Sequence, residues 1–91
     1  MADRPTLDQE VLHWLRRRVG ELMGRTGEAA IAAAPPTARL VLLKLGMPDL
    51  DTLEAAIATR WGVSLTLGAS TDTIRDIAGA IVAGMQRKAA A

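Results

Sequence analysis

The sequence predicts an all-α protein, a small bundle of four or five helices. Every long apolar pattern has the helical period, and no pattern shows the strict alternation that favours a strand. At 91 residues, with 49% apolar and 23% charged residues, the chain has the size and composition of one ordinary globular domain. We expect residues 1–6 to form an N-terminal arm, residues 7–86 the single helical domain and residues 87–91 a C-terminal tail.

Composition argues against several classes of function. The formal net charge of +1 gives no field strong enough to indicate binding to nucleic acid or to an anionic membrane. The chain has no cysteine, and its single histidine, His13, cannot build a zinc site alone. Two tryptophans are the only aromatic residues, whereas a platform for single-stranded nucleic acid needs several. We therefore predict no metal site and no nucleic-acid partner.

The sequence also lacks the patterns of a membrane protein and of a catalytic site. Its opening residues have no apolar core of a signal peptide, and no apolar run approaches the ~18 residues of a membrane span. Asp49, Asp51 and Glu54 cluster at a predicted helix start, where carboxylates favour the helix dipole, and no nucleophile stands beside a base. We expect a cytoplasmic protein with no enzymatic activity and no cofactor.

The first helix is expected from about Leu7 to Met23. Thr6 and Gln9 have the spacing of a capping box, and Gly24 follows the last apolar position. The apolar stripe recurs at helical spacing and consists of Leu7, Val11, Leu15, Val19 and Leu22, widened by Leu12, Trp14 and Met23. The run Arg16–Arg18 points in three directions, because successive helical residues are about 100° apart, and Arg17 can pair with Glu21.

The middle of the chain is expected to hold two shorter helical segments. The alanine-rich stretch from Glu28 to Ala34 predicts a short helix, which Pro35 and Pro36 must end. Thr37 can then cap a third segment, from Ala38 to Leu45, which is unusually apolar. Gly46 suits a left-handed stop of this segment.

Two longer helices are expected in the second half. Asp49 is a good N-cap for the first of them, and Gly62 ends it. Its apolar stripe consists of Leu50, Leu53, Ile57 and Trp61. The connection from Val63 to Leu67 could be extended. Thr73, with Asp76 three residues on, caps the final helix, whose stripe consists of Ile74, Ile77, Ala78, Ile81, Val82 and Met85.

The stretch from Leu42 to Glu54 contains Leu42, Leu45-Gly46-Met47, Pro48-Asp49-Leu50 and Leu53-Glu54. In this order the residues resemble the signature of the acyl carrier protein family: a leucine, two residues, Leu-Gly, a variable residue, Asp-Ser-Leu, and a helix with an apolar residue followed by Glu. Two further stretches are similar to that family, Arg60-Trp61-Gly62-Val63-Ser64-Leu65 and Thr73-Ile74-Arg75-Asp76-Ile77-Ala78. The opening helix looks like that of polyketide-type carrier domains.

The resemblance implies a carrier-like fold without the carrier chemistry. Asp49 occupies the position of the serine that accepts the phosphopantetheine arm in the family, and a carboxylate cannot take that arm. An alternative is a divergent carrier protein modified at another hydroxyl, namely Thr52, Ser64 or Ser70. The helix after Asp49 and the connection from Gly62 to Thr73 are each about two residues shorter than in the family, and two residues turn a helix by roughly 200°.

In carrier proteins the helix after the serine is the face that partner enzymes read. Carried over by position, this implies a partner-binding surface made of Asp49, Leu50, Leu53, Glu54 and Ile57. The same leucines and isoleucine could instead belong to the core. We therefore expect a non-catalytic docking or adaptor module, with a partner from polyketide or fatty-acid synthesis as the resemblance implies.

A helix-turn-helix protein that binds DNA is the alternative from another class. Ala58, Gly62 and Val63 have the spacing of that motif's first helix and turn. A recognition helix should follow at once. The stretch from Leu65 to Asp72 instead contains Gly68 and has no Lys, Arg, Gln or Asn that could read base edges.

Overall fold

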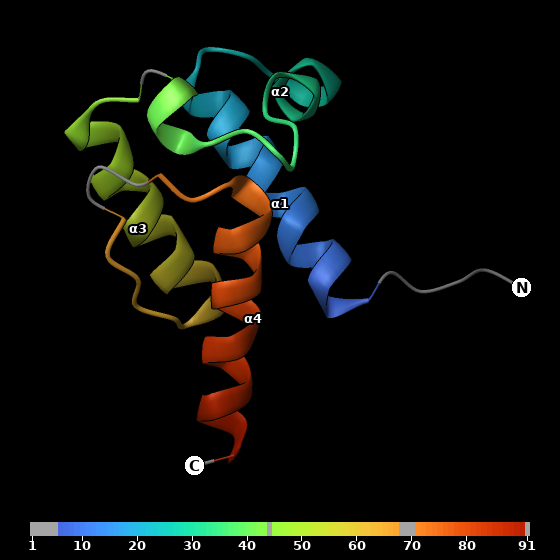
Figure 1. Cartoon of the computed structure of the whole chain (residues 1–91), viewed down its shortest axis with the longest axis vertical. Coiled ribbons are helices and arrows are strands. Elements are labelled where there is room, and N and C mark those ends of the chain that lie inside the picture. The colour runs from blue at the N-terminus through green and yellow to red at the C-terminus, as the bar shows by residue number, and fades with distance from the viewer. Residues whose placement is uncertain (1–5, 44, 68–70, 91) are drawn as a thin grey trace, which may run out of the picture.

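The computed structural model describes residues 6–43, 45–67 and 71–90. These residues form four α-helices and one 3₁₀ turn, which confirms the predicted all-α class (Figure 1). The elements are α1 (Leu7–Leu22), α2 (Gly27–Ala33), η1 (Leu40–Leu43), α3 (Met47–Trp61) and α4 (Ile74–Ala90). The predicted N-terminal arm lies outside the described residues except for Thr6, and so does Ser70.

Helix α1 begins as the sequence predicted. The hydroxyl of Thr6 accepts a hydrogen bond from the Gln9 backbone N–H at 3.2 Å, and the Gln9 side chain accepts one from the Thr6 N–H at 3.0 Å. This is the expected capping box. One side of the helix is fully buried, at Val11, Leu15, Val19 and Gly20. On the outer side, Arg17 forms the predicted ion pair with Glu21 at 3.6 Å.

Helix α2 packs tightly against α1. Gly20 lies so close to it that an added Cβ would overlap the backbone carbonyl of Ala30. Arg16 reaches from α1 to the C-terminal end of α2, where its guanidinium donates to the carbonyls of Ala34 at 2.9 Å and Ile31 at 3.1 Å. The Ile31 carbonyl also accepts from the Ala34 N–H at 3.2 Å, so Arg16 adds donors at a helix end that has few of them and stabilises the end of α2.

The segment after α2 forms less helix than predicted. We expected a helix from Ala38 to Leu45, but only η1 is helical there, and Lys44 lies outside the described residues. The backbone on either side of Arg39 is bonded to the start of α4. The Leu40 N–H donates to the carbonyl of Asp72, and the Ile74 N–H donates to that of Ala38 at 2.9 Å. These long-range hydrogen bonds form an isolated antiparallel β-bridge between Arg39 and Thr73. Such a bridge is incompatible with a continuous helix through Arg39.

Helix α3 begins at Met47, earlier than predicted, and Gly46 is its N-cap. The expectation that Asp49 is the N-cap is therefore wrong. The expectation of a left-handed Gly46 is also wrong, because the φ of Gly46 is −81°. Pro48 explains the difference. Its missing N–H and fixed φ suit the first turn of a helix, so the helix can start ahead of Asp49. The end of α3 is as predicted, because Gly62 adopts the left-handed conformation with φ 71°.

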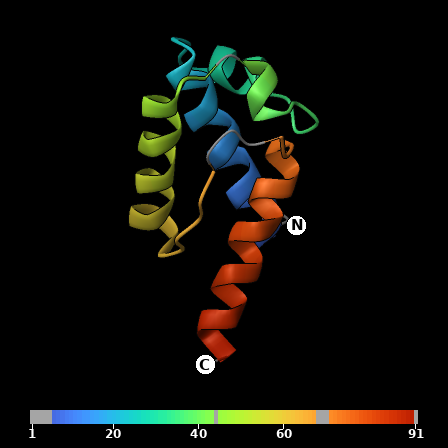
Figure 2. The ribbon, with the colours of Figure 1, turned by 60° about the vertical axis from the view of Figure 1, so that its left-hand side comes forward.

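Helix α4 carries the predicted cap and continues further than predicted. Thr73 and Asp76 exchange two hydrogen bonds, at 3.1 and 3.3 Å. The helix runs to Ala90, so residues 87–90 continue it. Its last turns extend past the other helices (Figures 1 and 2), and the ammonium of Lys88 donates to the carbonyl of Gly62 at 2.8 Å. This bond ties the extended end of α4 to the end of α3.

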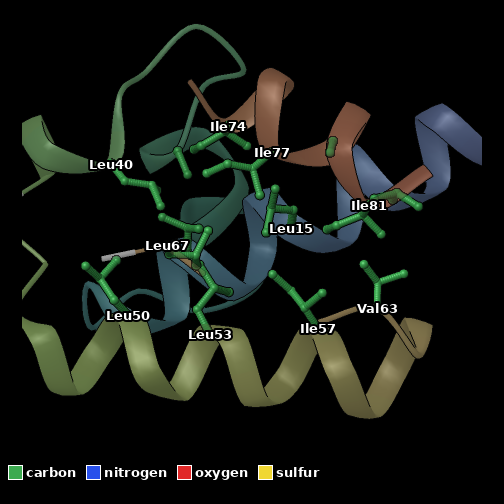
Figure 3. Packing of buried hydrophobic residues seen from close by; sticks show 14 of the residues in the cluster. Leu15, Leu40, Leu50, Leu53, Ile57, Val63, Leu67, Ile74, Ile77 and Ile81 are labelled. Atoms are coloured by element: carbon green, nitrogen blue, oxygen red, sulfur yellow. The ribbon is translucent and has the colours of Figure 1, made fainter. Parts of the chain in front are cut away.

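The core lies between α1, α3 and α4. Figure 3 shows Leu50, Leu53 and Ile57 of α3 directed toward Leu15 of α1 and toward Ile77 and Ile81 of α4. The connection from Val63 to Leu67 is neither helix nor strand, and it places Val63 and Leu67 in the same core. At the far end, Gly84 of α4 leaves room for Val63, since an added Cβ would lie 2.8 Å from a Val63 methyl.

Candidate functional site

The apolar residues of the predicted partner-binding surface are core residues. Leu53 and Ile57 are at most 1% exposed and Leu50 is 4% exposed. Burial of this kind stabilises each side chain by about 1.5–3 kcal/mol relative to exposure, so these residues cannot leave the core cheaply to contact a partner. The expected contact surface is corrected accordingly, because α4 and the 63–67 connection cover the side of α3 that the resemblance assigned to a partner.

The two acidic residues of that surface have roles within the fold. Asp49 is half-buried in the first turn of α3, and its carboxylate accepts a hydrogen bond from the Gly46 N–H at 3.2 Å. Glu54 is also half-buried, and its carboxylate accepts one from the Leu67 N–H at 3.2 Å. Glu54 thereby fixes the connection that covers α3. Each carboxylate satisfies a backbone donor, Asp49 at the exposed N-cap of α3 and Glu54 at the edge of the core, which is a structural use of the charge.

A different apolar surface lies just before α3. Among the described large hydrophobic residues, Leu42 is 72% exposed, Met47 55% and Val41 50%, and Leu7 follows at 38%. The first three fall within seven consecutive positions, on η1 and at the start of α3, where the chain turns at the top of Figure 1. We call Val41, Leu42 and Met47, together with Asp49 and the exposed Asp51, the η1–α3 surface. Sequence reasoning included Asp49 in a partner surface but missed the apolar part, because Val41 and Leu42 were assigned to a helix from Ala38 to Leu45.

The alternative hydroxyls differ in their environment. The Thr52 hydroxyl donates to the carbonyl of Pro48 at 2.9 Å, one turn back along α3, so it is engaged in the helix. Ser64 is exposed on the connection that follows the C-terminal end of α3. Neither hydroxyl occupies the place of Asp49.

The helix-turn-helix alternative requires a second helix directly after Gly62. Residues 63–67 are not helical, and the next described helix, α4, begins only at Ile74. Two residues of this segment, Val63 and Leu67, are buried in the core. The structure therefore contradicts the placement of a recognition helix at this position.

His13 is exposed in the middle of α1. In residues 6–43, 45–67 and 71–90, no group of His, Asp and Glu side chains converges as a metal site would require. No helix in the same part of the chain combines the length and the apolar character needed to cross a membrane.

Comparison of the chain with protein-family profiles, with curated proteins and with solved structures yields no match. The candidate site therefore depends on the geometry of this chain alone.

Proposed function

We propose that this protein is a non-catalytic docking module that binds a partner protein through the η1–α3 surface. The observation that carries the proposal is the exposure of Leu42, Met47 and Val41 within seven consecutive positions. Grouped exposed apolar residues mark interaction sites, whereas isolated ones are ordinary. The carrier-like character of the domain, with Asp49 in place of the serine, and a partner from polyketide or fatty-acid synthesis are parts of the proposal that rest on the sequence resemblance. A cytoplasmic location belongs to it as well.

The surface defines the chemistry of the partner. Asp49 and Asp51 follow the apolar residues closely in the chain, on the first two turns of α3. A partner with an apolar pocket and a basic rim complements this arrangement, because the carboxylates steer the encounter and the apolar side chains supply the burial. Truncation of Leu42 should then chiefly increase the dissociation rate, while charge reversal at Asp51 should chiefly lower the association rate.

Site-specific photo-crosslinking in the cells that produce the protein tests the proposal. A photoreactive residue at position 42 should capture one partner, and the same residue at Gln86, exposed on α4, should not. Leu42→Ser should then weaken binding of the purified partner at least about tenfold, equivalent to about 1.4 kcal/mol, at an unchanged melting temperature. Identical captures from positions 42 and 86, or a Leu42→Ser variant that binds normally, would contradict the proposed docking surface.

Incubation with a broad-specificity phosphopantetheinyl transferase and coenzyme A tests the carrier-like part separately. The mass of the wild-type chain should stay unchanged, because Asp49 cannot accept the arm. Modification of an Asp49→Ser variant would support the carrier-like part of the proposal. Modification of the wild type would favour the alternative of a carrier protein with another acceptor hydroxyl and would overturn the adaptor proposal.

A further inference from the structure

A groove runs along the surface between α1 and α3. It consists of two adjoining depressions, one beside Leu22 and Leu53 and the other beside Trp14 and Arg60. Arg18 and Ala56 line both depressions, which therefore adjoin. The groove shares no residue with the η1–α3 surface, and any ligand of the groove therefore goes beyond the function proposed above.

Two stacked pairs of tryptophan and arginine form one end of the groove. Trp14 of α1 meets Trp61 at the end of α3 edge to face, with ring centroids 5.8 Å apart and an interplanar angle of 89°. The guanidinium of Arg60 lies 4.0 Å from the centre of the Trp61 ring, and that of Arg18 lies 5.7 Å from the Trp14 ring. A guanidinium stacked in this way keeps its in-plane N–H donors and is restricted in position before a ligand arrives.

The charge of the groove is basic. Glu21 is the one acidic residue that lines it, and this carboxylate is already paired with Arg17 at 3.6 Å and with Arg18 at 3.4 Å. Within residues 6–43, 45–67 and 71–90, no carboxylate pairs with Arg60. Arg60 is thus a positioned cation without a counter-charge in the described chain, next to an apolar floor.

We infer that the groove binds an acidic amphipathic helix of a partner protein. Ala55 and Ala56 allow a helix to approach α3 closely, since packed helices need small side chains to reach interaxial distances of about 8 Å. Apolar residues of the incoming helix cover Trp14, Leu22 and Ala56, and its carboxylates pair first with Arg60, since Arg18 is already paired with Glu21. This is the helix-in-groove mode, with charge complementarity setting the choice of partner.

The two tryptophans provide the readout. They are the only aromatic residues of the chain, so all intrinsic fluorescence comes from the end of the groove. A ligand that covers Trp14 should shift this emission, whereas a ligand of the η1–α3 surface should leave it unchanged. The same signal therefore separates the two surfaces.

The test uses a display library of helical peptides of about 18 residues, with leucines at i, i+4, i+7 and i+11 and with Glu, Lys or Ser at the flanking positions. Selection on the full chain should enrich peptides rich in Glu. The best peptide, made synthetically, should shift the tryptophan emission saturably. Arg60→Glu should lower the affinity of the chain for this peptide at least about tenfold. Arg87→Glu, which makes the same charge change at an exposed position of α4, should leave the affinity within about twofold.

A second variant keeps the test open if Arg60→Glu does not fold. Ala55→Glu places a negative charge, like that of the peptide, on the exposed face of α3 and should also lower the affinity for the peptide. Leu42→Ser should leave this affinity unchanged. Enrichment of neutral or basic peptides, absence of enrichment, or equal losses for Arg60→Glu and Arg87→Glu would overturn the inference. A dimer of the chain that Arg60→Glu dissociates would also overturn it, because a second copy would then occupy the groove.

Discussion

The side of α1 that faces α2 is packed to backbone contact, whereas the side that faces α3 leaves a groove at the surface. On the α2 side, Gly20 admits the carbonyl of Ala30 and Arg16 bonds the last carbonyls of α2. On the α3 side, the helices meet through the edges of Trp14 and Trp61, and Arg18 and Arg60 lie over the rings. One helix therefore separates two tasks: its α2 side is held by backbone contact, and we expect the surface edge of its α3 side, at Trp14 and Arg18, to tolerate substitution.

The largest effect is expected from Gly20→Ala. The added methyl group overlaps the Ala30 carbonyl, which is backbone and cannot rotate away, so α1 and α2 must separate. We expect a loss of about 3 kcal/mol or more in the free energy of unfolding, measured by urea denaturation. Gly79→Ala is the matched control. Gly79 is helical and an added Cβ there meets no atom within 4 Å, so this variant should gain about 0.5–1 kcal/mol. Equal stabilities of the two variants would show that the α1–α2 contact is looser than described.

Leu53→Ala sharpens the distinction between core and surface. Leu53 is 1% exposed, and its truncation should cost about 2–5 kcal/mol. Leu42→Ala removes the same atoms from a side chain that is 72% exposed, and should change the stability by less than about 0.5 kcal/mol. Ile81→Ala, fully buried on α4, should resemble Leu53→Ala. A Leu53→Ala variant as stable as the wild type would return this residue to the predicted contact surface.

Arg16→Met tests the two hydrogen bonds that Arg16 donates to the C-terminal end of α2. The methionine keeps most of the aliphatic length of the arginine. It leaves the carbonyls of Ala34 and Ile31 without the guanidinium donors, so the free energy of unfolding should fall by about 1–3 kcal/mol. Arg17→Met breaks only an exposed ion pair and should cost less than about 0.5 kcal/mol. Thermal and urea unfolding of the pair give the comparison. If both arginines matter equally, the run Arg16–Arg18 acts as one charged patch, contrary to its geometry.

The features that depend on neighbours in the sequence were predictable. Thr6 with Gln9, Thr73 with Asp76, and Gly62 act within one helical turn, and all three are where the sequence placed them. The start of α3 was missed because Asp49 and Gly46 are competing caps within one turn, and the choice depends on Pro48. Helix length after Ala38 was overestimated, since bonds to Asp72 and Ile74 override the local apolar pattern.

The candidate sites were less predictable for a physical reason. An apolar stripe on α3 indicates which residues are buried away from water. It does not indicate whether α4 or another protein buries them. Leu50, Leu53 and Ile57 were therefore equally compatible with core and contact surface. The pairing of Trp14 with Trp61 joins residues far apart in the chain and has no local signal. Such contacts require the tertiary arrangement of α1 and α3.

The smallest effect is expected from Trp61→Phe. The indole N–H of Trp61 is buried and has no acceptor within the described residues, so the wild type carries the cost of a lost hydrogen bond. Phenylalanine removes that donor but also reduces the buried area and the surface on which Arg60 stacks. Because these terms oppose each other, the free energy of unfolding should change by less than about 1 kcal/mol. Trp14→Phe relieves no such donor and should be the more destabilising of the two. If Trp61→Phe instead costs several kcal/mol, the α3 side of α1 is as tightly packed as its α2 side, and the separation of the two tasks does not hold.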